Sequence, residues 1–371
     1  MSKVAVIGCG VVGAAIAYEL SLVPGLQVTV LEKQAPAAGA TSASLGILVG
    51  AVSQKVKGRN WQLRKTSLER YETLIPELEA LTQRTIPFNR QGILMLCFQA
   101  EELPRWQSLA AIRRSQGYEL EIWEAEKVKY ACPHLNVENV AAGIYSPRDR
   151  QLDPTVLTRA LVDAAKRQGA IFQFGVSVDK VESTAPDASS QRTCRQIHTT
   201  SGTIEVDWLV VAAGLGSLAL TSALSQPVDI RPVLGQGLQL RLPHPIGNPD
   251  FQPVISGNDV HIAPVGGGDY WVGATVEFPN DSGELVANPA LLEAVWQQAI
   301  AFCPPLASAT VVKTWSGLRP RPERQPAPII GYLPGFRNVL LATAHYRNGV
   351  LLAPATALEI RSCILAGLSD C

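Results

Sequence analysis

The sequence has no excess of either charge. Its 371 residues include 32 lysines and arginines and 32 aspartates and glutamates, so the formal net charge is zero. Nucleic acids and anionic membrane surfaces attract proteins that carry an excess of basic residues. The sequence therefore gives no electrostatic reason to expect either partner.

The chain also lacks paired cysteines. Its cysteines are odd in number, and no two of them form a C-x-x-C motif; they stand at positions 9, 97, 132, 194, 303, 363 and 371. This pattern argues against a disulfide framework or a zinc site and predicts reduced thiols in a cytoplasmic protein. No metal site is expected.

A leader segment and a membrane span are not expected either. The first apolar strand begins within three residues of the N-terminus, which leaves no room for a signal peptide. Apolar runs such as Val339 to Thr343 have the length of a strand, whereas a membrane-spanning helix needs about 20 residues.

A glycine-rich turn follows the first predicted strand. Residues 3 to 7 are apolar, and Gly8, Gly10 and Gly13 follow at the spacing G-x-G-x-x-G, before a predicted helix at residues 14 to 20. In dinucleotide-binding folds the first glycine permits the tight turn, the second lets the backbone approach a pyrophosphate, and the third lets helix and strand pack closely. The free N–H groups at the helix start then face the anion.

An acidic residue completes this motif. A second predicted strand, residues 27 to 31, ends at Glu32, where an acid accepts hydrogen bonds from ribose hydroxyls. A lone G-x-G-x-x-G can be a steric turn only, but here strand, helix and acid are all in place. The acid and the lack of a nearby arginine disfavour NADP and leave NAD and FAD open.

The later segments predict a second type of sheet. Helices are predicted at residues 61–83, 101–116 and 154–168, the last with Asp153 as its cap and Gly169 at its end. Strands are predicted at 92–98, 171–178 and 204–213, followed by antiparallel strands across 230–280 with a hairpin tip at 266–269. Residues 183–195 are expected to form a solvated connection.

Two short segments predict contact with a ligand. Gly214 would stand at the carboxyl edge of the sheet, where open α/β sheets bind ligands. Residues 40–47 are mostly small, so their backbone can approach a flat ligand closely. An ordinary loop has the same composition, and the residues of this loop alone leave both interpretations open.

The fold class is therefore α/β, with a dinucleotide-binding fold that another domain interrupts twice. We assign residues 1–55, 146–225 and 319–371 to a Rossmann-type domain with a parallel sheet and helices. Residues 56–145 and 226–318 form an α+β substrate-binding domain with a mostly antiparallel sheet.

The chain resembles the D-amino acid oxidase family of flavoproteins, most closely the glycine oxidases of thiamine biosynthesis, over nearly its full length. The resemblance is carried by the glycine turn with Glu32, by residues 41–47, 152–154 and 210–214, and above all by residues 314–320, 328–331 and 345–354. It implies FAD, bound noncovalently, since Cys303 does not match a flavin-attachment motif. The implied FAD contacts are Gly8, Gly10, Val11, Val12, Gly13, Glu32, Lys33, Ala40, Thr41, Leu45, Gly46, Ile47, Val176, Gly214, His345, Tyr346, Arg347, Asn348, Gly349, Val350 and Leu351.

The start of the final predicted helix suits this cofactor. If the helix begins at Gly349, its N–H groups and positive dipole end would stabilise negative charge on the reduced flavin. A glycine turn that merely precedes a surface helix would have the same sequence. His345, beside it, is expected to make a structural hydrogen bond rather than to act as a base.

Three residues are candidates for substrate binding. The resemblance places Arg319 at the substrate carboxylate and Arg347 near it, and a guanidinium can meet a carboxylate with two parallel hydrogen bonds. Each could instead be an ordinary solvated or ion-paired arginine. His261 stands where glycine oxidases have a tyrosine, and it is either a ligand of the carboxylate or a satisfied residue of the core or the pocket rim. Val276 and Leu45 also depart from the glycine oxidase pattern.

The implied reaction is the oxidation of glycine or another small amino acid by hydride transfer to the flavin, with release of an oxo acid, ammonia and hydrogen peroxide. Dioxygen would be the acceptor, and no catalytic side chain is required beyond the flavin. One alternative is a dehydrogenase of D-amino acids or secondary amines that uses another acceptor. The others are an NAD-dependent dehydrogenase and a flavin-binding protein without catalysis. A homo-oligomer is left open.

Overall fold

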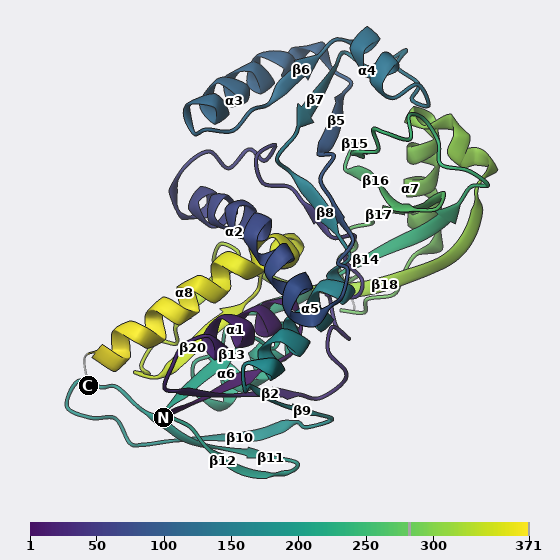
Figure 1. Ribbon diagram of the computed structural model, residues 1–371. Coiled ribbons are helices and arrows are strands. Elements are labelled where there is room, and N and C mark those ends of the chain that lie inside the picture. The colour runs from purple at the N-terminus through teal and green to yellow at the C-terminus, as the bar shows by residue number, and fades with distance from the viewer. Residues whose placement is uncertain (281–282, 370–371) are drawn as a thin grey trace.

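A six-stranded sheet forms the base of the protein. The computed structural model describes residues 1–280 and 283–369 (Figure 1). The strand order is β19 (Ile329–Tyr332), β20 (Val339–Thr343), β13 (Trp208–Val211), β1 (Ser2–Ile7), β2 (Leu26–Glu32) and β9 (Ile171–Phe174). All neighbours are parallel except β19, which runs antiparallel to β20.

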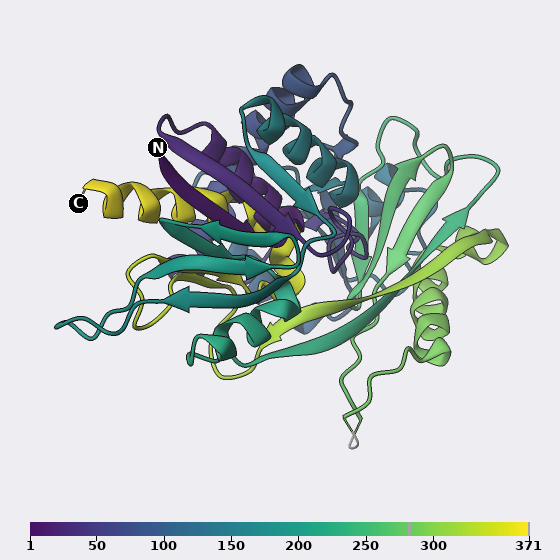
Figure 2. The ribbon, with the colours of Figure 1, turned by 90° about the horizontal axis from the view of Figure 1, so that it is seen from below.

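The two faces of this sheet are covered differently, and the alternation of side chains along each strand decides how. Val4 and Val6 of β1 pack in a core with the helices α1 (Val11–Ser21), α5 (Pro154–Arg167), α2 (Gly58–Thr82) and α8 (Gly349–Ser369). Ala5 and Ile7 face a small antiparallel sheet on the other side (Figure 2). That sheet consists of β10 (Val178–Ser183), β11 (Cys194–Thr199) and β12 (Gly202–Glu205), with α6 (Ser217–Ala223) nearby.

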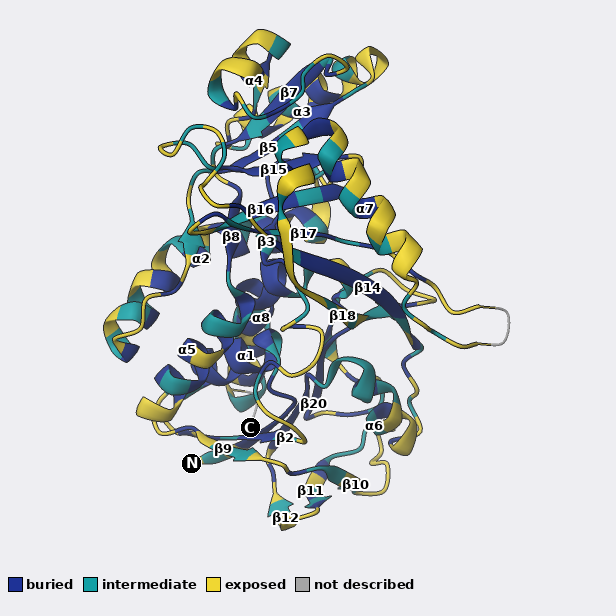
Figure 3. Ribbon diagram, turned by 90° about the vertical axis from the view of Figure 1, so that its right-hand side faces the viewer, coloured by how far each residue is buried: buried dark blue, intermediate teal, exposed yellow. Residues whose placement is uncertain are grey.

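An eight-stranded sheet forms the other half of the molecule. Its order is β18 (Thr310–Pro322), β14 (Ile230–Arg241), β17 (Asp269–Gly273), β16 (Val260–Gly266), β15 (Val254–Gly257), β5 (Ile93–Cys97), β7 (Ala142–Ser146) and β6 (Glu121–Trp123). Only the pair β15–β5 is parallel. Figure 3 shows its buried strands beside α7 (Pro289–Phe302), whose outer turns are exposed.

Shorter elements complete the chain. A small antiparallel sheet has three strands in the order β3 (Ile47–Leu48), β8 (Arg150–Leu152) and β4 (Phe88–Asn89). The remaining helices are α3 (Leu103–Ser115) and α4 (Ala125–Ala131). Short 3₁₀ turns are η1 (Ala100–Glu102), η2 (Gly214–Gly216), η3 (Pro304–Ser308) and η4 (Tyr346–Asn348).

The predicted fold class is confirmed, and so are several local details. Asp153 Oδ1 accepts hydrogen bonds from Thr155 N and Val156 N at 2.8 and 3.0 Å, so it caps α5 as expected. The hairpin tip at residues 266–269 joins β16 to β17. Two predicted strands were too long. Residues 171–178 divide into β9 and β10 at Gly175, and residues 204–213 divide into β12 and β13 around Asp207.

The predicted loop at residues 183–195 was slightly too long, because Ser183 ends β10 and Cys194 begins β11. The six cysteines that lie in the described part of the chain are free, and Cys371 lies outside it. Within residues 1–280 and 283–369, no group of three His, Cys, Asp or Glu side chains could hold a metal ion.

One described helix is apolar and long enough to cross a membrane by length and composition. It comprises η4 and α8, with a mean hydropathy of 1.5, and 56% of this apolar window is buried inside the protein. α8 packs against α1 and α2, which accounts for its apolar residues (Figure 1).

Candidate cofactor and substrate site

The glycine turn between β1 and α1 has no room for side chains at two positions. Gly8 has φ +103°, and a Cβ there would lie 2.6 Å from the carbonyl oxygen of Ala212. A Cβ on Gly13 would lie 2.0 Å from the carbonyl oxygen of Gly8. Gly10, the N-cap residue of α1, makes no side-chain capping hydrogen bond of its own. The turn therefore fits a pyrophosphate at the start of α1, as the fingerprint requires.

Glu32 lies beside this turn at the end of β2. Its Oε2 accepts a hydrogen bond from Cys9 N at 2.7 Å, and its Oε1 accepts one from Gln34 N at 2.9 Å. A carboxylate has further lone pairs, so it can still accept from ribose hydroxyls. The backbone oxygen of Glu32 accepts from Val176 N at 3.1 Å, which brings Val176 to the same edge, while Lys33 is exposed.

The small-residue loop contacts both α1 and β18. Thr41 Oγ1 accepts a hydrogen bond from Val11 N at 3.1 Å, at the first residue of α1. On the other side, Trp315 Nε1 of β18 donates to the oxygen of Ala43 at 3.1 Å. A Cβ on Gly317 would lie 2.3 Å from Ala43 Cβ, so this glycine lets the loop rest on β18.

The other residues predicted in this loop are placed in different ways. Ala40 is exposed, whereas Leu45 is buried and lies against Gly273 of β17. Gly46 accepts a hydrogen bond from Leu152 N at 3.1 Å, and Ile47 pairs with Gln151.

A buried aspartate that the sequence analysis missed fixes the chain after this loop. Asp149 is fully buried and accepts hydrogen bonds from the N–H groups of Gly50, Ala51 and Val52 at 2.8, 2.7 and 2.9 Å. Burial raises the pKa of Asp149, while the three donors favour its ionised form.

The carbonyl groups of the same segment are bound by a buried arginine. Arg113 Nε donates to Ala51 O at 2.6 Å, and its Nη2 donates to the oxygens of Ser53 and Lys55 at 2.8 and 2.9 Å. Its guanidinium lies 3.7 Å from the ring centroid of Trp61. Burial lowers the pKa of Arg113 to about 10, against the opposing effect of Asp149. No motif could have indicated these partners, because they lie about 50 to 100 residues away along the chain.

The end of β20 brings the C-terminal motif to the same edge of the six-stranded sheet. Thr343 Oγ1 donates to Gly214 O at 3.2 Å, which joins the ends of β20 and β13. Ala344 and Tyr346 have φ of 56° and 54°, a conformation that side chains other than glycine rarely adopt. Such strained residues cluster at ligand sites.

His345 stands between these two residues and is buried. Its Nε2 lies 2.9 Å from Thr356 Oγ1, and that hydroxyl donates to Leu352 O. Burial lowers the pKa of His345 to about 3, so the ring is neutral near pH 7. This geometry agrees with the expected structural hydrogen bond. The rest of the motif continues into η4 and the first turn of α8, with Arg347, Asn348, Gly349, Val350 and Leu351.

Arg319 has an unusual environment for a charged residue. It lies on β18 across from β14, where a Cβ on Gly235 would be 2.1 Å from its Nη2. Its Nη1 donates to Leu234 O at 3.0 Å, and no acid in the described chain pairs with it. Burial, and then the charge of Arg347, lower its pKa.

The other two predicted substrate residues are Arg347 and His261, and the charge of Arg347 acts on both Arg319 and His261. Arg347 Nη2 is 3.8 Å from Asp259 Oδ1, and the Asp259 side chain is 88% exposed. His261 Nδ1 lies 2.7 Å from Ser256 Oγ. Burial, and next the charge of Arg347, lower the pKa of His261 to about 4, so it offers a hydrogen bond and no charge near neutral pH. Val276 is exposed.

Comparison with known proteins identifies the family to which the chain belongs. The sequence model of the FAD dependent oxidoreductase family (DAO) matches residues 3–362, and the chain belongs to this family. It is therefore an enzyme that uses FAD, and the NAD alternative is excluded.

Particular relatives lie within this family. The chain is 33% identical over 367 residues to the bifunctional protein ThiO/ThiG of Synechocystis sp., covering 98% of this chain but 52% of that protein. It thus spans about half the length of these bifunctional relatives. It is 28% identical to the glycine oxidase of Geobacillus kaustophilus, covering 96% of this chain and 91% of the relative.

Solved structures have the same fold. The crystal structure of that glycine oxidase matches with a TM-score of 0.87 and 26% identity, covering 99% of this chain and 95% of the other. L-proline dehydrogenase from P. horikoshii matches with a TM-score of 0.86 at 22% identity, covering 99% and 94%. At that identity the likeness concerns the fold alone.

We predict that Asp149→Asn lowers the free energy of unfolding by about 3 kcal/mol in urea titrations, because the amide cannot accept all three N–H donors and Arg113 loses its buried counter-charge. The matched control is Asp163→Asn. Asp163 forms an exposed pair with Arg84 at 2.7 Å, and its loss should cost less than about 1 kcal/mol. Equal costs for the two variants would contradict the assigned role.

We also predict a pH dependence of stability from His345. Its folded pKa is about 3, whereas an unfolded histidine titrates near ~6.5. The unfolded chain therefore binds more protons between these values, and stability is lost as pH falls below about 6.5, by up to ~1.4 kcal/mol per pH unit. His345→Gln should reduce the slope of unfolding free energy between about pH 5 and 6.5. Replacement of the exposed His244 should not, and an unchanged slope in His345→Gln would refute the prediction.

Proposed function

We propose that this chain is an oxidase of glycine or another small amino acid. FAD, when bound, would serve as the oxidant, and the α-carbon of the substrate would lose a hydride to it. The substrate imine then hydrolyses to an oxo acid and ammonia, and dioxygen accepts the electrons to give hydrogen peroxide. We propose that residues 1–55, 146–225 and 319–371 bind the cofactor through the residues described above, and that residues 56–145 and 226–318 bind the substrate.

The observation that carries this proposal is the pair Arg319 and Arg347. Arg319 is half-buried, and among the described residues it has only a backbone carbonyl as a partner, while Arg347 has only a distant, exposed acid. A substrate carboxylate would neutralise both cations, including Arg319, whose charged state is disfavoured by burial and then by the charge of Arg347. Neutral His261 would add a hydrogen bond at the same place.

No general base is needed for this chemistry. Hydride leaves from an amino acid whose amine is already neutral, so the protein has to fix the α-carbon and exclude other orientations. His345 agrees with this view, since its ring nitrogen is engaged with Thr356 and its pKa is far below neutral. The arginines hold one end of the substrate, and β18 holds Arg319.

The relatives support glycine as the first substrate to test. Relatives named glycine oxidase align over more than nine-tenths of their own length. The bifunctional ThiO/ThiG relatives support a further proposal, that the imine of glycine enters synthesis of the thiazole of thiamine. The chain departs from the glycine oxidase pattern at His261, Val276 and Leu45, and these departures favour a preferred substrate other than glycine. The second candidate function is therefore a dehydrogenase of secondary amines or D-amino acids, which would pass the electrons to an acceptor other than dioxygen.

We predict that glycine reduces the bound flavin in anaerobic stopped-flow experiments faster than sarcosine, proline or D-amino acids do. Aerobic turnover with glycine should give peroxide in a one-to-one ratio to the oxo acid. Faster reduction by a secondary amine or D-amino acid would transfer the proposal to that substrate. Reduction without peroxide would identify a dehydrogenase.

We predict that Arg319→Met weakens glycine binding about 100-fold, or about 2.8 kcal/mol, because the carboxylate loses a half-buried cation. The measurement is the glycine dependence of flavin reduction. Arg321→Met is the matched control, since Arg321 lies on the same strand and pairs with Glu323 at 3.3 Å. It should bind glycine like the unchanged protein. Similar affinities in the two variants would exclude Arg319 from the site.

A further inference from the structure

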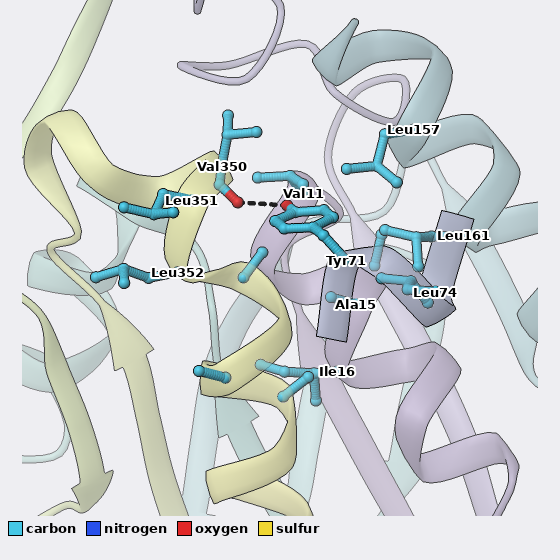
Figure 4. Close-up of a cluster of buried hydrophobic side chains, with 14 of the residues drawn as sticks. Val11, Ala15, Ile16, Tyr71, Leu74, Leu157, Leu161, Val350, Leu351 and Leu352 are labelled. Atoms are coloured by element: carbon cyan, nitrogen blue, oxygen red, sulfur yellow. Dashed lines mark hydrogen bonds between the residues drawn. The ribbon is translucent and has the colours of Figure 1, made fainter. Parts of the chain in front are cut away.

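Helix α8 contains a proline that breaks its hydrogen-bond pattern close to the cofactor segment. Pro354 has no N–H, so the carbonyl of Val350, four residues earlier, lacks its helical donor. The hydroxyl of Tyr71 on α2 donates to this carbonyl (Figure 4). Tyr71 is fully buried. A side chain from another helix thus replaces the missing bond in the first turn of α8.

Helix α2 also supplies an acceptor for an amide of α8. Ala355 N, the first amide after the proline, donates to Ser67 Oγ at 3.3 Å, and Ser67 is fully buried. Ser67 and Tyr71 are four residues apart, so they lie on one face of α2. This face therefore satisfies a carbonyl before Pro354 and an amide after it.

A buried cation extends this face toward the start of α8. Arg64, three residues before Ser67, is 6% exposed. Its Nη2 donates to Asn348 Oδ1 at 3.2 Å, and its Nη1 donates to Asn60 O at 3.0 Å. Its Nε is buried without a hydrogen-bond partner among the described residues, and no described acid forms an ion pair with Arg64.

The carboxylate of Asp149 influences this charge without pairing with it. Asp149 acts on Arg64 electrostatically, but its oxygens accept three backbone N–H groups. Two positive features, the guanidinium of Arg64 and the N-terminal end of α8, therefore meet at Asn348 and Gly349. Because Asn348 accepts from Arg64 through its oxygen, its two amide N–H donors remain for other partners.

We propose that Arg64, Ser67 and Tyr71 are positioning residues for FAD: they fix the first turn of α8, and Arg64 adds positive charge there, so that together they favour the reduced, negatively charged cofactor. This inference depends on the FAD-binding family and not on the amino acid substrate. A purely structural role would need the packing of these side chains and the hydroxyl of Tyr71, but not the charge of Arg64.

The test measures the flavin of the holoenzyme without an amino acid. Sulfite affinity and the two-electron reduction potential both report how well the site stabilises negative charge on the cofactor. In Arg64→Met, sulfite affinity should fall about tenfold, which corresponds to a potential about 30 mV lower for a two-electron couple. Arg64→Lys keeps the charge and should recover at least half of this loss. Tyr71→Phe should weaken sulfite binding by about threefold.

Matched controls separate this role from a loss of stability. Arg70→Met removes a cation from the same helix, but Arg70 pairs with Glu19 and Glu77 at 2.9 and 2.7 Å. Tyr118→Phe removes another buried hydroxyl, which donates to Glu69 at 3.4 Å. Both controls should keep the sulfite affinity of the unchanged protein, even where their melting temperature falls.

The outcomes decide for or against the proposal. If Arg64→Met binds FAD poorly but Arg64→Lys restores the FAD affinity of the apoprotein, the charge is needed, which supports it. Unchanged sulfite affinity in Arg64→Met, or the same shift in Arg70→Met, would overturn it. Equal loss of FAD binding in Arg64→Met and Arg64→Lys, with equal melting temperatures, would also overturn it. None of these results bears on which amino acid is oxidised.

Discussion

The site depends on the backbone hydrogen bonds of one irregular segment, residues 41–55. This segment connects the glycine turn, the eight-stranded sheet and α2, and it passes through the interior, where unpaired N–H and C=O groups are costly. Thr41 binds the start of α1, and Ala43 accepts from Trp315. Farther along, Asp149 accepts three N–H groups, and Arg113 donates to three carbonyls. Side chains thus replace the partners that a helix or sheet would have provided.

The same solution recurs at the C-terminal end of the site. Pro354 leaves a carbonyl without its donor, and α2 supplies one from Tyr71. In both places an irregular backbone beside the proposed cofactor site is stabilised by buried side chains from distant segments. The site is therefore fixed by polar contacts in the core, although most of that core is apolar.

The sequence predicted the features whose physical cause is local. The spacing of Gly8, Gly10 and Gly13 follows from sterics within a few residues, and Asp153 caps the helix that it directly precedes. The antiparallel hairpin at residues 266–269 has the same local origin. The C-terminal motif predicted the segment that reaches the carboxyl edge of the sheet.

What the sequence did not predict depends on pairs that are far apart in the chain. Asp149 lies almost 100 residues from the N–H groups that it accepts, and nothing in its neighbourhood distinguishes it from a surface acid. The role of Tyr71 can be predicted only when the helix that packs beside Pro354 is known. The charge state of His261 likewise follows from its burial and from Arg347, which only the folded chain brings together.

Strand β18 places two parts of the site on one rigid element. Trp315, Gly317 and Arg319 alternate with exposed residues, so they share one side of the strand, with about 7 Å between successive members. The first two support the loop beside the cofactor, and the third is the arginine proposed for the carboxylate. If Arg319 binds the carboxylate as proposed, the strand fixes the distance between that carboxylate and the loop at Ala43. Adaptation to a longer substrate would have to come from residues off this strand, since a shift by one position would turn Arg319 to the opposite face.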